Sequence, residues 1–183
     1  MTMIVLPGIN GSGTNHWQTH WEAALPDTRR FQPADWDRPD LADWMEALTR
    51  EVDESGERPI LVAHSLACLL VAHWAARAGH SAGKVRGAFL VAVPDPHRET
   101  FPAAAAPGFG DVPTVRLPFP ALIIASTDCP YGSADHTARR AHEWGAPVIV
   151  AGALGHINEA SGLADWPQGA ALLAAFVAGT AGR

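Results

Sequence analysis

The chain of 183 residues is poor in cysteine, in basic clusters and in long apolar runs, and each shortage excludes a class of protein. Its two cysteines, Cys68 and Cys129, match no zinc spacing and are too few for a disulfide framework. The formal net charge is −6 and no block of Lys or Arg occurs, so we expect no nucleic-acid partner. The longest apolar runs are strand-length, well under the roughly 20 residues that cross a bilayer.

Location and domain number follow from the same features. The start, MTMIVLPG, has no basic region and no cleavage site, and the free cysteines fit a reducing compartment. We therefore expect a cytoplasmic protein without a membrane partner. The length suits one domain over residues 1–183, and the sequence gives no indication of its oligomeric state.

Short apolar segments alternate with segments of helical spacing, which predicts an α/β fold. The expected strands are Met3–Leu6, Ile60–Ala63, Gly87–Val93, Ala121–Ala125 and Pro147–Ala151, with a weaker signal at Arg30–Phe31. They lack polar alternation, as expected for strands buried on both faces. We predict a three-layer sandwich: a mostly parallel sheet with helices on both faces.

Residues 94–120 contain proline every few positions, so regular structure is not expected there. Such a segment either covers a binding site or is a surface connection packed by its own phenylalanines Phe101, Phe109 and Phe119.

Three residues that follow predicted strands form the order of a catalytic triad. Ser65, Asp128 and His156 lie after different strands, whose carboxyl ends meet at one edge of a parallel sheet. The order Ser, Asp, His is that of the α/β-hydrolase fold, whose nucleophile occupies a tight strand-to-helix turn. The alternative role for Ser65 is a helix cap. Ala63 and Ala67 replace the glycines usual in this turn, and alanine is the smallest side chain that could do so.

An oxyanion needs two fixed backbone N–H donors. In this fold one donor belongs to the residue after the nucleophile, here Leu66, and the other to the loop after the first strand, here Gly8, Ile9 and Asn10. For Trp17 and His16 we expect either core packing or a place at the edge of the substrate site, and we include Trp17 among the candidate substrate-binding residues.

No metal or cofactor is expected. His16 and His20 are four residues apart, the spacing of paired ligands on a helix, but the HExxH signature and a third ligand are missing. The glycine-rich segment GINGSG matches neither a P-loop nor GxGxxG.

Several motifs together resemble a known family. LPGINGSGTNHWQTHWE, LVAHSLAC, PFPALIIASTDCPYGS and AGALGHINEASGLADWPQG are similar to the small α/β-hydrolases that include retinoblastoma-binding protein 9 and many bacterial serine hydrolases. The resemblance implies a compact hydrolase without a large lid domain, with Ser65 as nucleophile and His156 as base. It also implies carboxylesterase or, in places, aminopeptidase-like activity.

The acid of the triad departs from the family pattern. Family members often read A-S-x-x-D-P-Y, and a gapless match places Cys129 at the acid position with Asp128 one residue earlier. A thiol is a weak acceptor and mostly uncharged, so it replaces a carboxylate poorly. We expect Asp128 to act as the acid. Asp95, after the third predicted strand, is the alternative, and a triad without an acid is the third possibility.

The sequence thus predicts a serine hydrolase that cleaves small esters through an acyl-enzyme on Ser65, with amides as further candidate substrates. Two alternatives stay open: a binding protein that kept the fold but turns over weakly or not at all, and an aminopeptidase-like hydrolase.

Overall fold

Six parallel strands form the centre of the protein. The computed structural model describes residues 2–180, and its strands follow the order β2-β1-β3-β4-β5-β6 with every neighbouring pair parallel. The strands are β1 Met3–Leu6, β2 Thr28–Arg30, β3 Ile60–His64, β4 Gly87–Val91, β5 Ala121–Ala125 and β6 Val148–Val150. The parallel sheet predicted from the apolar runs is confirmed.

The central strands account for the missing polar alternation. Every residue of β1, β3, β4 and β5 is buried, whereas the edge strands β2 and β6 are partly exposed. Four expected strands have different boundaries: β3 extends to His64, β6 shortens to Val148–Val150, and β2 and β4 also shift. The weak signal at Arg30–Phe31 corresponds to β2, which begins at Thr28, and β4 ends at Val91 because Ala92 has a φ of 56° and turns the chain.

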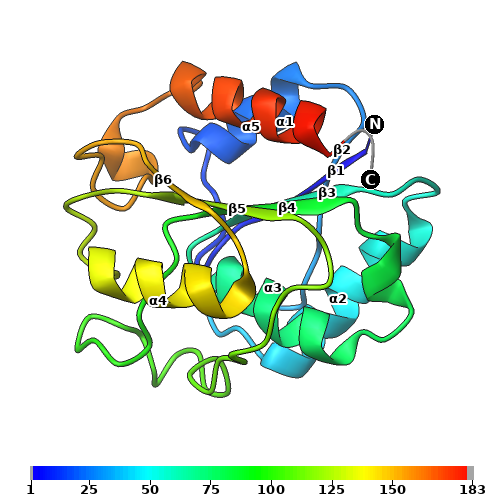
Figure 1. Ribbon diagram of the computed structural model, residues 1–183, viewed down its shortest axis with the longest axis horizontal. Helices are drawn as coiled ribbons and strands as arrows, with labels where there is room; N and C mark the ends of the chain where they lie inside the picture. The colour runs from blue at the N-terminus through cyan, green and yellow to red at the C-terminus, as the bar shows by residue number, and fades with distance from the viewer. Residues whose placement is uncertain (1, 181–183) are drawn as a thin grey trace.

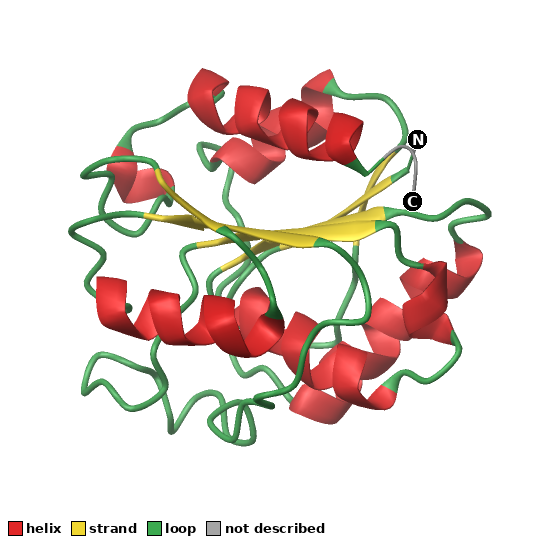
Figure 2. Cartoon of the chain, in the orientation of Figure 1, coloured by secondary structure: helices red, strands yellow, loops and turns green. Residues whose placement is uncertain are grey.

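Helices cover both faces of the sheet, as expected. In Figures 1 and 2, α1 and α5 lie against one face and α2, α3 and α4 against the other. The helices are α1 Trp17–Ala24, α2 Leu41–Glu54, α3 Leu66–Arg77, α4 Ala134–Trp144 and α5 Pro167–Gly179. Two clusters of buried apolar side chains, one on each face of the sheet, form the core.

The strand register brings the ends of the strands level with one another. Leu6 pairs with Ala63 and His64 with Val91. On the other side of β4, Ala125 pairs with Val150. The loops that follow β1, β3, β5 and β6 therefore leave the sheet at the same edge, where parallel sheets bind their ligands.

The proline-rich segment both borders a cleft and packs its own phenylalanines into the core. Residues 92–120, all of which the structure describes, contain no helix or strand. Phe101, Phe109 and Phe119 are buried in the core, and Phe101 also lines the cleft at the carboxyl edge of the sheet. Among residues 2–180, no helix combines the length and hydropathy needed to cross a bilayer.

Candidate active site

Ser65 forms a strained turn between β3 and α3. Its φ of 55° and ψ of −124° lie in a region that side chains other than glycine rarely adopt. The turn is held on both sides, because Ser65 N donates to Val91 O at 2.9 Å and Cys68 N donates to Ser65 O at 2.9 Å. The Ser65 side chain makes no capping hydrogen bond to α3. The helix-cap role is therefore wrong for this serine.

Alanine fits at the two positions where glycine is usual in such a turn. Ala63 and Ala67 are both fully buried in the cluster that packs α3 against the sheet. Their methyl groups fill core space, and the strained turn forms in their presence.

The structure brings Ser65 and His156 together. The Ser65 Oγ lies 2.8 Å from the Nε2 of His156, which comes from the loop after β6. His64 Nε2 donates to the carbonyl of His156 at 2.9 Å, and Trp17 Nε1 donates to the next carbonyl, that of Ile157, at 2.8 Å. The Tyr131 ring packs on the imidazole with 4.5 Å between ring centroids. The imidazole thus has a defined position.

Burial decides the protonation of this histidine. His156 is 9% exposed, and burial followed by the nearby His64 lowers its pKa to about 3. Burial likewise lowers the pKa of His64 to about 4. Both rings are neutral at physiological pH, so His156 can accept a proton there.

Cys129 occupies the place of a triad acid. Its Sγ lies 3.2 Å from Nδ1 of His156, the ring nitrogen that faces away from Ser65. Burial raises the pKa of this thiol above its usual value, so the side chain is an uncharged S–H group. The cysteine that the gapless match aligned with the family's acid is therefore the third member of this constellation.

The expectation that Asp128 lies on His156 is wrong. The Asp128 carboxylate accepts from Ser126 Oγ at 2.7 Å and from Gly155 N at 2.8 Å. Those hydrogen bonds, from Ser126 first, hold its pKa below the usual range. Leu154 N also donates to Ser126 Oγ at 2.9 Å, so the pair clamps the backbone just before His156. Adjacent side chains after a strand diverge, which turns Asp128 away from the ring when Cys129 faces it.

Asp95, the alternative acid, is engaged elsewhere. Its carboxylate lies 3.4 Å from Nδ1 of the buried His136 and accepts the N–H of His97 at 3.0 Å. Its own N–H donates to Tyr131 O at 2.7 Å. Asp95 therefore ties the proline-rich segment to α4 and to the loop after β5.

The loop after β1 approaches the serine turn closely. A Cβ on Gly8 would lie 3.0 Å from the Ser65 Cβ, so this close approach favours glycine. The Asn10 N–H donates to Trp36 O at 2.8 Å and is already used. The Ile9 N–H donates to no backbone carbonyl among the described residues. Leu66 is the first residue of α3, so its N–H has no hydrogen-bond acceptor within the helix. The hydrogen bond of Asn10 removes it from the expected donor set of Gly8, Ile9, Asn10 and Leu66, and Gly8, Ile9 and Leu66 stay candidates.

These groups border a cleft of about 380 Å³. Its wall includes predicted residues and four that were not assigned to a substrate site from the sequence: His64, Tyr131, Asn158 and Glu159. It also includes His16, for which a place at the site edge was one of two expected roles. The adjacency of His64 to Ser65, and of Asn158 and Glu159 to His156, was the available signal.

Trp17 does not line the cleft. It is buried beneath the site, against Trp21 and Trp166, and it supports the loop that carries His156. Its expected place at the edge of the substrate site is therefore wrong, and its role there is packing.

The two histidines with metal-ligand spacing have separate partners. His20 Nδ1 lies 2.7 Å from Asp165, while His16 Nδ1 accepts from Gln18 N at 3.2 Å. Among residues 2–180, no group of three or more His, Cys, Asp or Glu side chains is arranged to hold a metal ion.

Known proteins resemble this chain in sequence and in fold. The family model described as serine hydrolase matches residues 3–175. A protein named as a YdeN-like hydrolase from Pectobacterium atrosepticum is 29% identical, with a TM-score of 0.85, over 98% of this chain and 91% of that one. The alignment with the ydeN gene product of B. subtilis has 18% identity and a TM-score of 0.71, covering 97% and 100% of the two chains.

A third solved structure extends the likeness to an esterase. A protein named as an aryl esterase from Burkholderia cenocepacia is 16% identical, with a TM-score of 0.65, over 100% of this chain and 91% of that one. At such low identities the likeness shows the fold alone. No curated protein matches the chain. The α/β-hydrolase fold predicted from the sequence is confirmed.

Proposed function

The chain belongs to the serine hydrolase family, and on that premise we propose that it hydrolyses small carboxylic esters through an acyl-enzyme on Ser65. The observation that carries the proposal is the 2.8 Å contact of Ser65 Oγ with His156 Nε2, made by a serine in a strained turn at the wall of a cleft. Strain of this kind, held by hydrogen bonds on both sides, is typical of functional positions.

The chemistry follows from the geometry. Ser65 Oγ attacks the carbonyl carbon of the ester while His156 Nε2 takes the hydroxyl proton. The oxyanion that forms accepts hydrogen bonds from the backbone N–H groups of Ile9 and Leu66. His156 then gives the proton to the departing alcohol, and a water activated by the same nitrogen releases the acid and restores Ser65.

Cys129 slows this reaction because it does not hold His156 in the tautomer that accepts the serine proton. To accept the serine proton, the imidazole must carry its hydrogen on Nδ1 and donate it to Cys129 Sγ, a weak acceptor. The thiol can instead donate S–H to Nδ1, which places the hydrogen on Nε2 and blocks the base. A carboxylate would permit only the productive form, and the wrong tautomer costs about 10⁴ in a serine protease. We therefore propose a slow enzyme that favours activated esters over amides.

The test is labelling and loss of activity at Ser65. We expect a fluorophosphonate probe to label Ser65 and Ser65→Ala to lower the hydrolysis of a p-nitrophenyl ester by about 10⁴-fold. Ser81→Ala is the matched control, because Ser81 precedes β4 at the opposite end of the strands and bonds Asp53 at 3.0 Å. Activity that survives Ser65→Ala would contradict the mechanism.

One observation favours a second candidate, a binding protein that retains the fold without useful turnover. The Nδ1 of His156 faces a thiol, and both nearby carboxylates are engaged elsewhere. This candidate predicts probe labelling without turnover, since phosphonylation needs one attack and no deacylation. A steady release of product, dependent on Ser65, would exclude it.

The finer assignments stay proposals. The resemblance to retinoblastoma-binding protein 9 and its relatives supports carboxylesterase activity on small-molecule esters, and an aminopeptidase-like reaction on amides is the harder reaction for a triad without a carboxylate. A cytoplasmic location and a single domain over residues 1–183, both expected from the sequence, stay predictions.

A further inference from the structure

A buried imidazole nitrogen in the cleft wall has no partner. His16 is 4% exposed and lines the cleft, and its Nε2 makes no hydrogen bond within the described structure. The other nitrogen of the ring is used, because Nδ1 accepts the N–H of Gln18 at 3.2 Å and so caps α1. Buried polar atoms without partners are uncommon in folded proteins, and this one belongs to a residue that lines the cleft, so a ligand in the cleft is a candidate partner.

The protonation of His16 follows from its surroundings. Burial, followed by the neighbouring His64 and Arg30, lowers the pKa of His16 to about 3, so the ring is neutral at physiological pH. A neutral imidazole carries one hydrogen. Because Nδ1 accepts a hydrogen bond from the backbone, that hydrogen lies on Nε2. A residue of the cleft wall therefore holds a neutral N–H donor that has no acceptor among the described residues.

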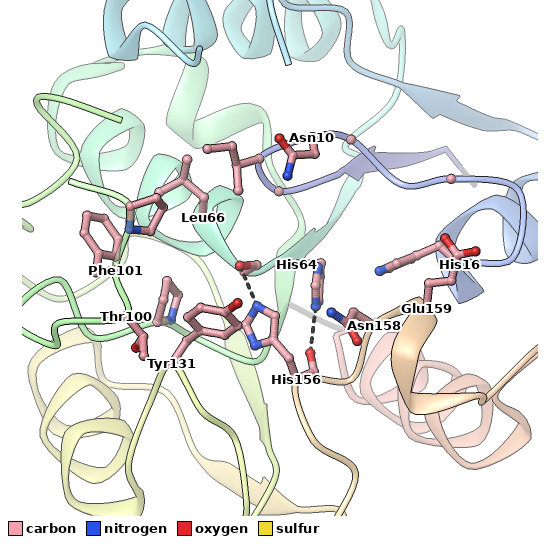
Figure 3. Close-up of a pocket in the computed structure, with 17 residues that line it drawn as sticks. Asn10, His16, His64, Leu66, Thr100, Phe101, Tyr131, His156, Asn158 and Glu159 are labelled. Carbon is pink, nitrogen blue, oxygen red and sulfur yellow. Dashed lines mark hydrogen bonds between the residues drawn. The ribbon is translucent and has the colours of Figure 1, made fainter. Parts of the chain in front are cut away.

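The two sides of the cleft differ in character. In Figure 3, Thr100, Phe101 and Tyr131 lie on one side of the catalytic imidazole, while His16, Asn158 and Glu159 lie on the other. Pro94 and Pro102 also line the cleft. A substrate that spans the cleft thus meets an apolar wall at one end and a polar wall at the other.

We propose that His16 is a specificity-determining residue whose Nε2–H donates a hydrogen bond to a neutral oxygen of the substrate. This inference rests on the proposed esterase function. The substrate class is an ester with an apolar group on one side of the scissile carbonyl and an ether, hydroxyl or carbonyl oxygen on the other.

The neighbouring charges favour a neutral oxygen over an ionic group. Glu159 is not free to bind a cation with its full carboxylate, because Oε1 accepts from Asn15 Nδ2 at 2.8 Å. The nearby guanidinium of Arg30 is paired with Glu22 at 2.7 Å, so it does not attract an anion. An ammonium group also offers no lone pair to the Nε2–H of His16.

Two substitutions distinguish the proposed role of His16 as a hydrogen-bond donor from its role as the N-cap of α1. His16→Asn keeps an oxygen near the position of Nδ1, and asparagine is a good helix cap, but it removes the distal N–H. His16→Gln reverses this, since its amide N–H₂ reaches the region of Nε2 while the capping acceptor is lost. A merely structural His16 predicts a larger fall in Tm for the glutamine variant and no effect on substrate preference in either.

The preference is measured with isosteric esters. p-Nitrophenyl hexanoate is compared with analogues in which an ether oxygen replaces the γ or δ methylene, and pentyl butyrate with the matching analogues in its alcohol chain. Each kcat/KM is divided by the rate of alkaline hydrolysis of the same ester. We expect one ether analogue to exceed its hydrocarbon parent by about tenfold, the usual upper effect of one hydrogen bond. That ratio falls to about one in His16→Asn and persists in His16→Gln.

Two results would overturn the inference: no ether preference in either series, or a preference that is unchanged in His16→Asn. Either can occur while Ser65 still hydrolyses the parent esters, so the proposed function then stands. If no ester is hydrolysed, the proposed function fails, and the ratio is taken from dissociation constants of the intact esters. These are measured by NMR from the backbone amide shifts of the cleft residues, which the wild type and both variants retain, with the same two outcomes.

Discussion

The serine turn and the loop after β5 both face His156, and they differ in how fully they meet the needs of a triad. At the turn, Ser65 contacts Nε2 at 2.8 Å and the backbone is held in the strained conformation of a nucleophile. In the loop, a thiol contacts Nδ1 at 3.2 Å, while the carboxylate one residue earlier bonds Ser126 and Gly155. The contact between the serine and the histidine is therefore present, whereas the carboxylate that would contact Nδ1 lies one residue before the position that faces the ring.

The contrast shows how far the order of residue types determines a site. Ser, Asp and His occur in the expected order, and all three lie within a few residues of the carboxyl edge of the sheet. Asp128 lies in the expected loop but does not contact the His156 ring, because neighbouring side chains leave the backbone in different directions. In this protein Asp128 supports the loop of His156, whereas Cys129 touches the ring.

Cys129→Asp should produce the largest change in activity, because it places a carboxylate on the ring nitrogen that now faces a thiol. A carboxylate at Nδ1 can only accept, so it enforces the productive tautomer and stabilises the imidazolium. We expect kcat/KM for a p-nitrophenyl ester to rise by about 10²-fold, part of the 10⁴ that the wrong tautomer costs elsewhere. Steady-state kinetics on the two proteins measure it.

The control for this substitution is Cys129→Asn, which has the shape of aspartate without the charge. Its amide can donate to Nδ1 and so favours the blocked tautomer. Equal rates in the aspartate and asparagine variants would contradict the role given to Cys129.

The pH profile gives the next largest contrast. A base with the ordinary histidine pKa of about 6.5 loses roughly 30-fold in activity from pH 8 to pH 5, because it becomes protonated. The pKa of His156 is about 3, so the wild-type kcat/KM should change less than about threefold over that range. In Cys129→Asp the new carboxylate raises this pKa and moves the acid limb to higher pH.

Unfolding must be excluded at the acid end of that profile. His16 and His64 have folded-state pKa values of about 3 and 4, below the value of 6.5 for an unfolded chain. Between those values the unfolded chain binds more protons, so stability is lost as pH falls below about 6.5. Circular dichroism at each pH identifies the range in which the protein stays folded. A wild-type acid limb near pH 6.5, in folded protein, would contradict the expected His156 pKa.

Gly8→Ala tests the side of the site that contains the Ser65 turn and the loop after β1. Its Cβ would lie 3.0 Å from Ser65 Cβ and 3.2 Å from His64 O, so the loop must shift by a few tenths of an ångström. Such a shift moves the Ile9 N–H relative to the oxyanion, and we expect kcat to fall about tenfold. Gly110→Ala is the control, since nothing lies within 4 Å of its added Cβ. Equal kinetics in both variants would count against this loop as part of the site.

Most of the fold could be predicted because its signals are local and repeated. Each central strand is an apolar run buried on both faces, and the alternation with helices leaves few topologies. The close approach of Ser65 and His156 was also predictable, since the strand ends of one sheet share an edge.

The rest depends on side-chain direction, which no residue type reveals. Asp128 was preferred over Cys129 because a carboxylate suits the chemistry, although the gapless match aligned Cys129 with the acid. Trp17 has two expected roles, core packing and the site edge, and its burial against Trp166 decides for packing. His16 was weighed for its spacing to His20, and its unpartnered nitrogen becomes visible only in three dimensions.

Asp128→Asn should have the smallest effect and tests the other side of the comparison. The Oδ1 of asparagine can accept from both Ser126 Oγ and Gly155 N, so the clamp on the His156 loop survives without the charge. We expect kcat/KM to change less than about threefold, whereas the same exchange in a true triad acid costs about 10⁴. Asp128→Ala, which removes both hydrogen bonds, should lower Tm and activity together. A collapse of activity in Asp128→Asn with an unchanged Tm would show instead that Asp128 swings to the ring during turnover.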